Sequence, residues 1–216
     1  MLPIGLLGGT FDPIHYGHLR LAEELADALG LDTVRFLPTG TPAHRDRPLA
    51  SAAHRLAMVK LAIADNPRFV LDEHEAHKTA PCYMVDTLTT LRSEVGATTP
   101  IILFLGADAF AGLTAWHHWR RLFDLAHLAV ARRPGDGGET WQTSLPAELA
   151  GELAARLASE PSTLRASPAG RIVVDTVTQL AIAARQIRAL CAAGLEPRYL
   201  LPDAVLDYIN QNRLYR

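Results

Sequence analysis

The residues Gly8-Gly9-Thr10-Phe11-Asp12-Pro13-Ile14-His15-Tyr16-Gly17-His18-Leu19 decide the fold of this chain. They follow a short apolar run, Leu2 to Leu7, that predicts a buried strand, and they precede a stretch with the periodicity of an amphipathic helix. A strand followed by glycines and then a helix is typical of the carboxyl edge of a parallel α/β sheet, where ligands usually bind.

The chemistry of this stretch points to a phosphate site. Gly8 and Gly9 allow a close approach of the backbone because they carry no Cβ. A helix N-terminus offers N–H groups and a positive dipole end, and His15 and His18, spaced i,i+3, can point to one ligand there. A tight turn or a capping histidine would explain each feature alone, but the combination within twelve residues favours function.

Composition excludes several classes of protein. The chain has 216 residues, 49% of them hydrophobic and 20% charged, with a net charge of −2, which suits one domain with a proper core. This balance argues against a nucleic-acid partner, which would need a basic surface. Cys82 and Cys191 form no metal pattern or disulfide framework and fit a reducing cytoplasm. No run approaches the ~20 apolar residues of a membrane span, so we expect a cytoplasmic protein without a membrane partner. A homo-oligomer stays open.

Strand-like and helix-like patterns alternate along the chain, which predicts an α/β fold: a Rossmann-like, doubly wound parallel sheet with helices on both faces and a C-terminal helical part. Helical stripes include Leu56, Val59 and Ile63 after a capping Ser51, and a loop is expected from Pro38 to Pro48. The other expected strands are Thr33 to Leu37, Arg68 to Leu71, Pro100 to Leu105, His127 to Ala131 and Arg171 to Asp175.

We expect a single domain over residues 1–216. Its core would comprise residues 1–135 and 171–181, with an insertion at about 139–168 organised around Leu149, Leu153 and Leu157, and C-terminal helices over 182–216. No internal repeat is visible.

An ordered set of motifs resembles one family along nearly the whole chain. The opening motif resembles the nucleotidyltransferase superfamily with a His-x-Gly-His signature. Further segments resemble the bacterial nicotinate-mononucleotide adenylyltransferases within it: Pro42-Ala43-His44-Arg45, Pro81-Cys82-Tyr83-Met84-Val85-Asp86-Thr87-Leu88, Gly106-Ala107-Asp108 followed by Trp116, Arg132-Arg133-Pro134-Gly135, and the end from Leu201-Pro202 to Leu214-Tyr215.

The resemblance implies that ATP and nicotinate mononucleotide give nicotinate adenine dinucleotide and pyrophosphate. The mononucleotide phosphate is already a nucleophile, so catalysis reduces to positioning and charge stabilisation. The resemblance assigns His15 and His18 to catalysis and implies Mg²⁺ held by ATP phosphates and water rather than by side chains. It places the following residues at ATP: Gly8, Gly9, Thr10, His15, His18, Gly106, Asp108, Arg133, Ile182, Arg185 and Arg188.

The resemblance also implies a mononucleotide site. Trp116 would stack on the pyridine ring, and backbone N–H groups near Met84 and His117 would read the carboxylate. Asp12, His44, Arg45 and Tyr83 complete the implied set. Trp116 could instead be a buried helix tryptophan, and His44 and Arg45 a solvated pair. We expect Asp86 to be structural, and we discount a metal site at His117-His118 because adjacent helical residues do not face one way.

Two segments depart from the family pattern. The family's Ile-Ser-Ser/Ala-Thr-x-Ile-Arg is Ile182-Ala183-Ala184-Arg185-Gln186-Ile187-Arg188 here, so capping and phosphate-binding hydroxyls are absent. We expect Arg185 or Arg188 to replace part of their contacts. Cys82 and Met84 replace Ser and Thr, which leaves open a greater tolerance for nicotinamide mononucleotide; we expect the acid to remain preferred.

Three alternatives remain. A related transferase for phosphopantetheine or a choline-like phosphate would not explain Trp116 or the segment from Pro81 to Leu88. A nucleotide-binding protein with weakened catalysis is favoured only by the change at Ala183 to Arg185. A nucleic-acid binder would rest on the local pairs Arg120-Arg121 and Arg132-Arg133 against a near-neutral balance.

Overall fold

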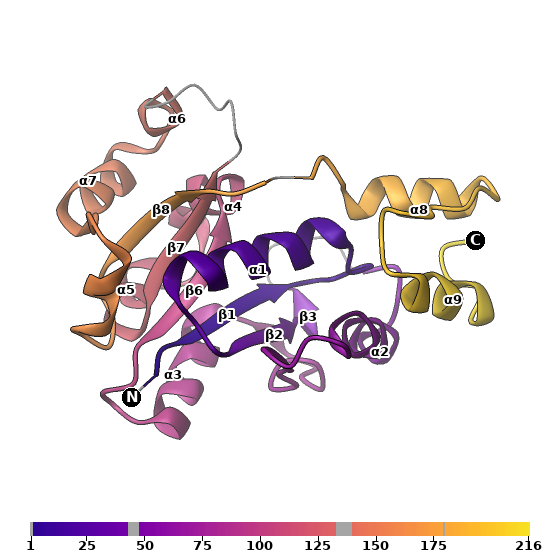
Figure 1. Cartoon of the computed structure of the whole chain (residues 1–216), viewed down its shortest axis with the longest axis horizontal. Helices are drawn as coiled ribbons and strands as arrows, with labels where there is room; N and C mark the ends of the chain where they lie inside the picture. The colour runs from indigo at the N-terminus through magenta and orange to yellow at the C-terminus, as the bar shows by residue number, and fades with distance from the viewer. Residues whose placement is uncertain (1, 43–47, 133–139, 179) are drawn as a thin grey trace. The chain divides into compact units, whose positions relative to one another are not determined.

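The computed structural model describes residues 2–42, 48–132, 140–178 and 180–216. A six-stranded sheet in the order β4-β2-β1-β6-β7-β8, with helices packed against it, organises the fold (Figure 1). This confirms the predicted α/β class. The strands are β1 Ile4–Gly9, β2 Val34–Pro38, β3 Thr41–Pro42, β4 Phe69–Leu71, β5 Pro81–Cys82, β6 Ile101–Gly106, β7 His127–Arg132 and β8 Ile172–Thr176.

The α-helices include one over the stripe expected from Leu56 to Ile63 and one over the expected Leu149 and Leu153. The α-helices are α1 Tyr16–Leu29, α2 Ala52–Ile63, α3 Met84–Val95, α4 Ala107–Ala111, α5 Leu122–Leu125, α6 Thr140–Thr143, α7 Ala147–Arg156, α8 Ala184–Ala192 and α9 Asp203–Gln211. Short 3-10 helices cover Leu113–Ala115, Trp119–Arg121 and Pro161–Arg165. No helix in these described ranges is both long and apolar enough to cross a membrane.

The centre of the sheet is parallel and strongly apolar. Ile4 pairs with Ile101, Leu103 with Leu128, and Val130 with Val174. Residues 101–105 and 127–131 are all buried, which explains their continuous apolar sequence. Gly9 is the last residue of β1 and Gly106 the last residue of β6, and the sequence predicts ligand contacts at such carboxyl ends.

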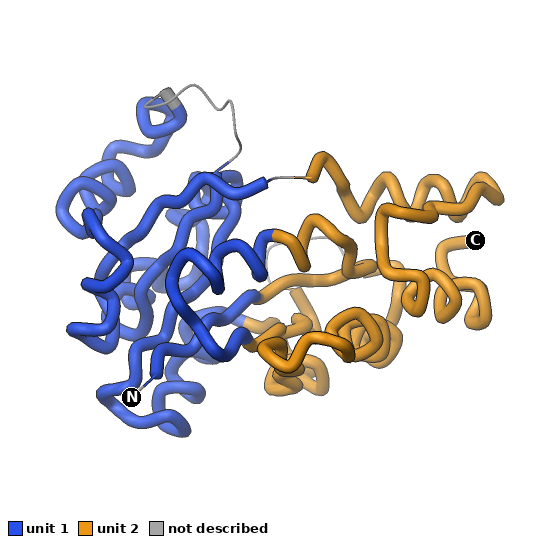
Figure 2. The backbone as a smooth tube through the Cα atoms, viewed as in Figure 1, with its two compact units in different colours: residues 1–7, 21–34, 83–179 blue, residues 8–20, 35–82, 180–216 orange. Residues whose placement is uncertain are grey.

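The chain divides into two compact units, shown in blue and orange in Figure 2. Unit 1 comprises residues 1–7, 21–34 and 83–179, and unit 2 comprises residues 8–20, 35–82 and 180–216. Unit 2 therefore contains the histidine motif, the segment from Arg35 to Cys82, and the helices α8 and α9. The division into a core, an insertion and C-terminal helices that the sequence suggests stays a prediction.

The structure differs from three local expectations. Ser51 does cap α2, accepting the N–H of His54, but Leu56 is only half-buried and the inward stripe runs through Arg55, Met58, Val59 and Ile63. Leu157 is 48% exposed, whereas Leu149 and Leu153 are buried as expected. The loop after Pro38 contains β3, which pairs in parallel with β5.

Candidate active site

The two histidines of the opening motif form a stacked pair at the start of α1. Their ring centroids lie 3.7 Å apart with 26° between the planes. The backbone N–H of His15 donates to Nδ1 of His18 at 3.3 Å. Because Nδ1 accepts this bond, a neutral His18 carries its proton on Nε2. The edge of the Phe11 ring, 5.1 Å away at 84°, further fixes the plane of His18.

His15 is held in its neutral form. Its side chain is buried, with 6% of the residue exposed, and this burial lowers the pKa of His15 to about 4. Its Nδ1 is buried and has no hydrogen-bond partner within the described part of the chain. A neutral ring at pH 7 can stack on His18 without the repulsion that two imidazolium ions would suffer.

The glycine turn is tied to neighbouring backbone. The carbonyl of Gly9 accepts the N–H of Thr39 at 2.9 Å, and the carbonyl of Thr10 accepts Nη1 of Arg55 at 2.7 Å. A Cβ on Gly9 would lie 3.1 Å from the ring of Phe11, so a side chain there would crowd the motif. Gly8, Gly9 and Thr10 are all half-buried. The turn is thus fixed in place but not sealed from solvent.

Several N–H groups in the first turn of α1 already donate to carbonyls of the protein. Tyr16 donates to the carbonyl of Leu200 at 3.1 Å, and His18 donates to the carbonyl of His15 at 2.9 Å. The N–H of Leu19 also points to the His15 carbonyl, at 3.3 Å. An anion at this helix end would therefore meet the imidazoles more than these amides.

Asp12 is the buried centre of a polar network. Its carboxylate accepts the N–H groups of Leu49 at 2.9 Å and Ala50 at 3.1 Å, and the hydroxyl of Tyr215 at 2.7 Å. Nη1 of Arg188 donates to the Asp12 carbonyl at 2.7 Å and lies 3.9 Å from the carboxylate. Asp12 is 6% exposed. The carboxylate thus accepts hydrogen bonds from three groups of the protein itself. Its contact with substrate stays a prediction.

Sequence reasoning missed Arg55, a second buried centre of this unit. Only 1% of Arg55 is exposed, and its guanidinium donates to four carbonyls, of Ala50, Thr10, Thr39 and Gly40. Burial lowers its pKa, while the charge of Asp12 acts in the opposite direction. Its place on the inward stripe of α2, three residues before Met58, was the signal that could have revealed it.

The start of α8 also reaches the motif. A Cβ on Gly17 would lie 3.7 Å from the carbonyl of Ile182, so Ile182 comes near the helix that carries His18. Ala183 is the N-cap of α8, in an extended conformation and with no side-chain hydrogen bond. Arg185 is exposed, and Arg188 is half-buried against Asp12. The structure thus brings Ile182 and Arg188 to the motif.

Unit 1 holds the predicted pyridine contacts. Tyr83 is the N-cap of α3 and Met84 its first residue, and the ring of Tyr83 lies 4.5 Å from the ring of His117. Trp116 ends a 3-10 turn by donating its N–H to Leu113, and it is half-buried. Two residues later, His118 adopts a left-handed conformation with φ of 49°. Tyr83 and His117 are therefore neighbours, and their contact with a mononucleotide stays a prediction.

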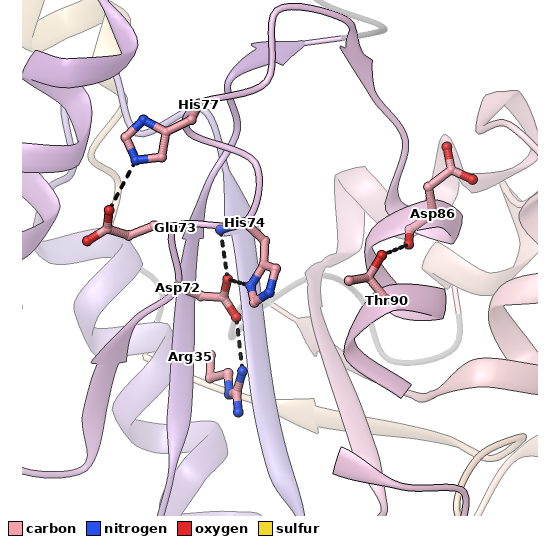
Figure 3. Close-up of polar contacts among 7 residues, drawn as sticks. All are labelled: Arg35, Asp72, Glu73, His74, His77, Asp86 and Thr90. Carbon is pink, nitrogen blue, oxygen red and sulfur yellow. Dashed lines mark hydrogen bonds and ion pairs between the residues drawn. The ribbon is translucent and has the colours of Figure 1, made fainter. Parts of the chain in front are cut away.

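Other predicted residues have simpler settings. Gly106 is the N-cap of α4, and Asp108, in its first turn, is exposed. The backbone carbonyl of Asp86 accepts the hydroxyl of Thr90 at 3.0 Å (Figure 3). His44, Arg45 and Arg133 lie outside the described residues.

Asp72 is a further polar centre that the sequence did not reveal. Its carboxylate pairs with Arg35 at 3.3 Å and with Nδ1 of His74, and Glu73 pairs with His77 at 3.1 Å (Figure 3). Within the described ranges, no three His, Cys, Asp or Glu side chains cluster so as to hold a metal ion. A cavity of about 460 Å³ lies at the C-terminal helices, and no residue of the predicted site lines it.

Comparison with known proteins identifies the family. The model of the cytidylyltransferase-like family matches residues 6–187, a span that includes the motif and the start of α8. Probable nicotinate-nucleotide adenylyltransferases are similar over 99% of the chain. The protein of Dechloromonas aromatica is 55% identical with 98% of its length covered, and that of Aeromonas hydrophila is 48% identical with 97% covered. The chain belongs to the cytidylyltransferase-like family and, within it, to the nicotinate-nucleotide adenylyltransferases.

A solved structure shares the fold at low identity. The Plasmodium falciparum nicotinic acid mononucleotide adenylyltransferase complexed with NaAD superposes with a TM-score of 0.75 at 17% identity, covering 100% of this chain and 98% of that one. This likeness supports the architecture of the sheet and its helices.

Proposed function

We propose that this enzyme transfers the adenylyl group of ATP to nicotinate mononucleotide, a reaction of NAD biosynthesis. A phosphate oxygen of the mononucleotide attacks the α-phosphorus of ATP, and the bond from that phosphorus to the bridging oxygen breaks. Pyrophosphate leaves and nicotinate adenine dinucleotide forms. The observation that carries the proposal is the stacked His15–His18 pair at the start of α1. It lies in a chain that is 55% identical to a probable nicotinate-nucleotide adenylyltransferase.

His18 is the donor in this proposal. With its Nδ1 accepting the N–H of His15, its Nε2 carries a proton for a phosphate oxygen of ATP. His15 keeps the ring of His18 in plane by stacking, and a positioned donor stabilises charge that develops on the triphosphate. Gly8, Gly9, Thr10, Ile182, Arg185 and Arg188 would surround the nucleotide.

Nucleotidyltransferases generally use a divalent metal. For this chain we assign Mg²⁺ to the phosphate oxygens of ATP and to water, since Mg²⁺ keeps much of its hydration. Bound in this way, the ion would offset charge on the triphosphate.

Unit 1 would recognise the mononucleotide. The half-buried ring of Trp116 offers a face for the pyridine, and Tyr83 and His117 lie beside each other. Met84 starts α3, and the first N–H groups of a helix have no intrahelical partner, so they suit a carboxylate. Cys82 is buried and directs its thiol to the carbonyl of Glu75, so it would not contact the substrate.

The uncapped start of α8 favours a second candidate, a nucleotide-binding protein with weakened catalysis. Ala183 supplies no hydroxyl at the position where the family pattern has one. Arg185, exposed two residues further along the chain, is the replacement we propose. An Arg185→Ala variant with an unchanged KM for ATP would remove it from that role.

Pyrophosphate release tests the proposal. Wild type and His18→Ala would be compared with ATP, Mg²⁺ and either nicotinate or nicotinamide mononucleotide. Release that requires the acid and is lost in His18→Ala supports the transferase. Equal turnover of the amide would overturn the acid preference. ATP binding without release from either mononucleotide would favour the binding protein.

A further inference from the structure

The hydroxyl of Tyr215 reaches the catalytic motif across 203 positions of sequence. It donates to Oδ1 of Asp12 at 2.7 Å, and Tyr215 itself has a left-handed backbone with φ of 64°. Both residues belong to unit 2. The contact was not predicted from sequence, where Tyr215 only formed part of a family-like ending.

Asp12 is held by four donors, which come from three separate segments of the chain. Leu49 and Ala50 precede α2, Arg188 lies on α8, and Tyr215 follows α9. The motif continues through Pro13 and the fully buried Ile14 to His15, so a fixed Asp12 fixes the backbone three residues before the catalytic pair.

Of these donors, the hydroxyl of Tyr215 lies closest to the Asp12 carboxylate, at 2.7 Å. Arg188 approaches the carboxylate only to 3.9 Å and makes its short bond to the carbonyl. Burial raises the pKa of Tyr215 far above its usual value, and the charge of Asp12 adds to this effect. The hydroxyl therefore remains a donor at every pH at which the enzyme would be assayed.

We propose that Tyr215 is a positioning residue of the adenylyl transfer: by holding Asp12, it sets the backbone that places His15 under His18. This inference rests on the proposed function. A carboxylate that loses one donor is left partly uncompensated in a buried site and draws closer to its remaining partners. A shift of that kind moves His15, and misplacements of about 1 Å can cost 10²-fold in rate.

Tyr215→Phe tests the proposal because it removes the hydroxyl and keeps the ring. The matched control is Tyr208→Phe, which removes another tyrosine hydroxyl of the same C-terminal segment, one that bonds His54 at 3.0 Å and is not bonded to Asp12. We expect Tyr215→Phe to lower kcat about tenfold with KM values changed much less. We expect Tyr208→Phe to keep kcat, even where urea denaturation shows an equal loss of stability.

A spectroscopic readout separates this inference from the proposed function. In protein labelled with ¹⁵N-histidine, signals of His15 and His18 are assigned from the His15→Asn and His18→Ala spectra. Tyr215→Phe should shift these two signals and leave that of His127 in place, whereas Tyr208→Phe should leave all three unmoved.

Unmoved His15 and His18 signals in Tyr215→Phe would overturn the proposal, whatever happens to kcat. An equal loss of kcat in Tyr208→Phe would overturn it as well. An inactive wild type would contradict the proposed function instead, and the histidine signals would still decide whether Tyr215 positions the pair.

Discussion

Gly17 leaves the space that the ring of His15 fills: a Cβ on Gly17 would lie 3.0 Å from both Cε1 and Nδ1 of that ring. Nine in ten contacts of Cβ atoms in proteins are longer than this, so the His15 ring would have to move by a few tenths of an ångström. The glycine of the His-x-Gly-His motif is thus explained by the packing of its first histidine.

Gly17→Ala should therefore lower activity without unfolding the protein. We expect kcat to fall about tenfold or more, because the displaced His15 no longer supports His18 in plane. Steady-state kinetics of pyrophosphate release measure this. Gly151→Ala is the control, since a Cβ there meets nothing within 4 Å and alanine favours the helix α7. Equal kinetics for wild type and Gly17→Ala would show that His15 has more room than its contacts imply.

The burial of His15 also makes stability depend on pH. Its pKa is about 4 in the folded chain and near 6.5 when unfolded, so the unfolded state binds more protons between these values. The free energy of unfolding should fall as the pH drops from 6.5 to 4, by about 2 kcal/mol at pH 5 from this residue. Buried His127, whose pKa is also lowered by burial, acts in the same direction.

Urea denaturation of wild type and His15→Asn at pH 7 and pH 5 isolates the share of His15. The variant should lose about 2 kcal/mol less than wild type between the two pH values. Identical losses in both proteins would mean that His15 is not the group that titrates.

Arg55 should act on stability through its four carbonyl partners. Arg55→Met leaves the carbonyls of Thr10, Thr39, Gly40 and Ala50 without their donor, and we expect a loss of about 3 kcal/mol or more. Arg55→Lys should restore little, because an ammonium cannot reproduce the planar fork. Lys60→Ala, exposed on the same helix, should stay within about 0.5 kcal/mol of wild type. Full rescue by lysine in chemical denaturation would contradict the need for the fork.

The sequence predicted the sheet and the motif because both follow local rules. Apolar runs and a strand–glycine–helix junction need only neighbouring residues, and the stacked pair lies within four positions. Arg55 was missed because the expected stripe placed Leu56 inward, whereas the three carbonyls of the adjoining loops bind a cation there. Leu157 was misplaced because the end of a helix stripe does not show where the partner surface stops.

Sequence patterns could not predict hydrogen-bond partners that are far apart in the chain. The family resemblance implies a substrate contact for Asp12, and this contact stays a prediction. The carboxylate also meets Tyr215 and the residues before α2, and no periodicity connects these segments. The same holds for Asp72, whose partner Arg35 is 37 positions away.

Two tryptophans three positions apart should behave differently. Trp116 is half-buried, whereas Trp119 is buried, with Arg120 4.4 Å above its ring and Phe123 at its edge. Trp116→Ala should raise KM for nicotinate mononucleotide about tenfold and leave KM for ATP and the melting temperature near wild type. Trp119→Ala should cost about 3–5 kcal/mol of stability. Thermal melts beside steady-state kinetics distinguish the two, and a stability loss in Trp116→Ala without a KM change would assign that ring to the core.

Ala183→Ser should improve both the helix and the nucleotide site. Ala183 already has the extended conformation of an N-cap, with φ of −125° and ψ of 138°, so a serine hydroxyl can accept an N–H of the first turn of α8. We expect a gain of about 1 kcal/mol in the free energy of unfolding. The hydroxyl also returns a polar group near Ile182, so KM for ATP should fall, while KM for nicotinate mononucleotide should stay constant.

Ala189→Ser, exposed within the same helix, is the control and should lower stability slightly and leave both KM values unchanged. A stabilised Ala183→Ser with an unaltered KM for ATP would confine that position to helix capping and leave Arg185 and Arg188 as the cations of α8 proposed to bind the triphosphate.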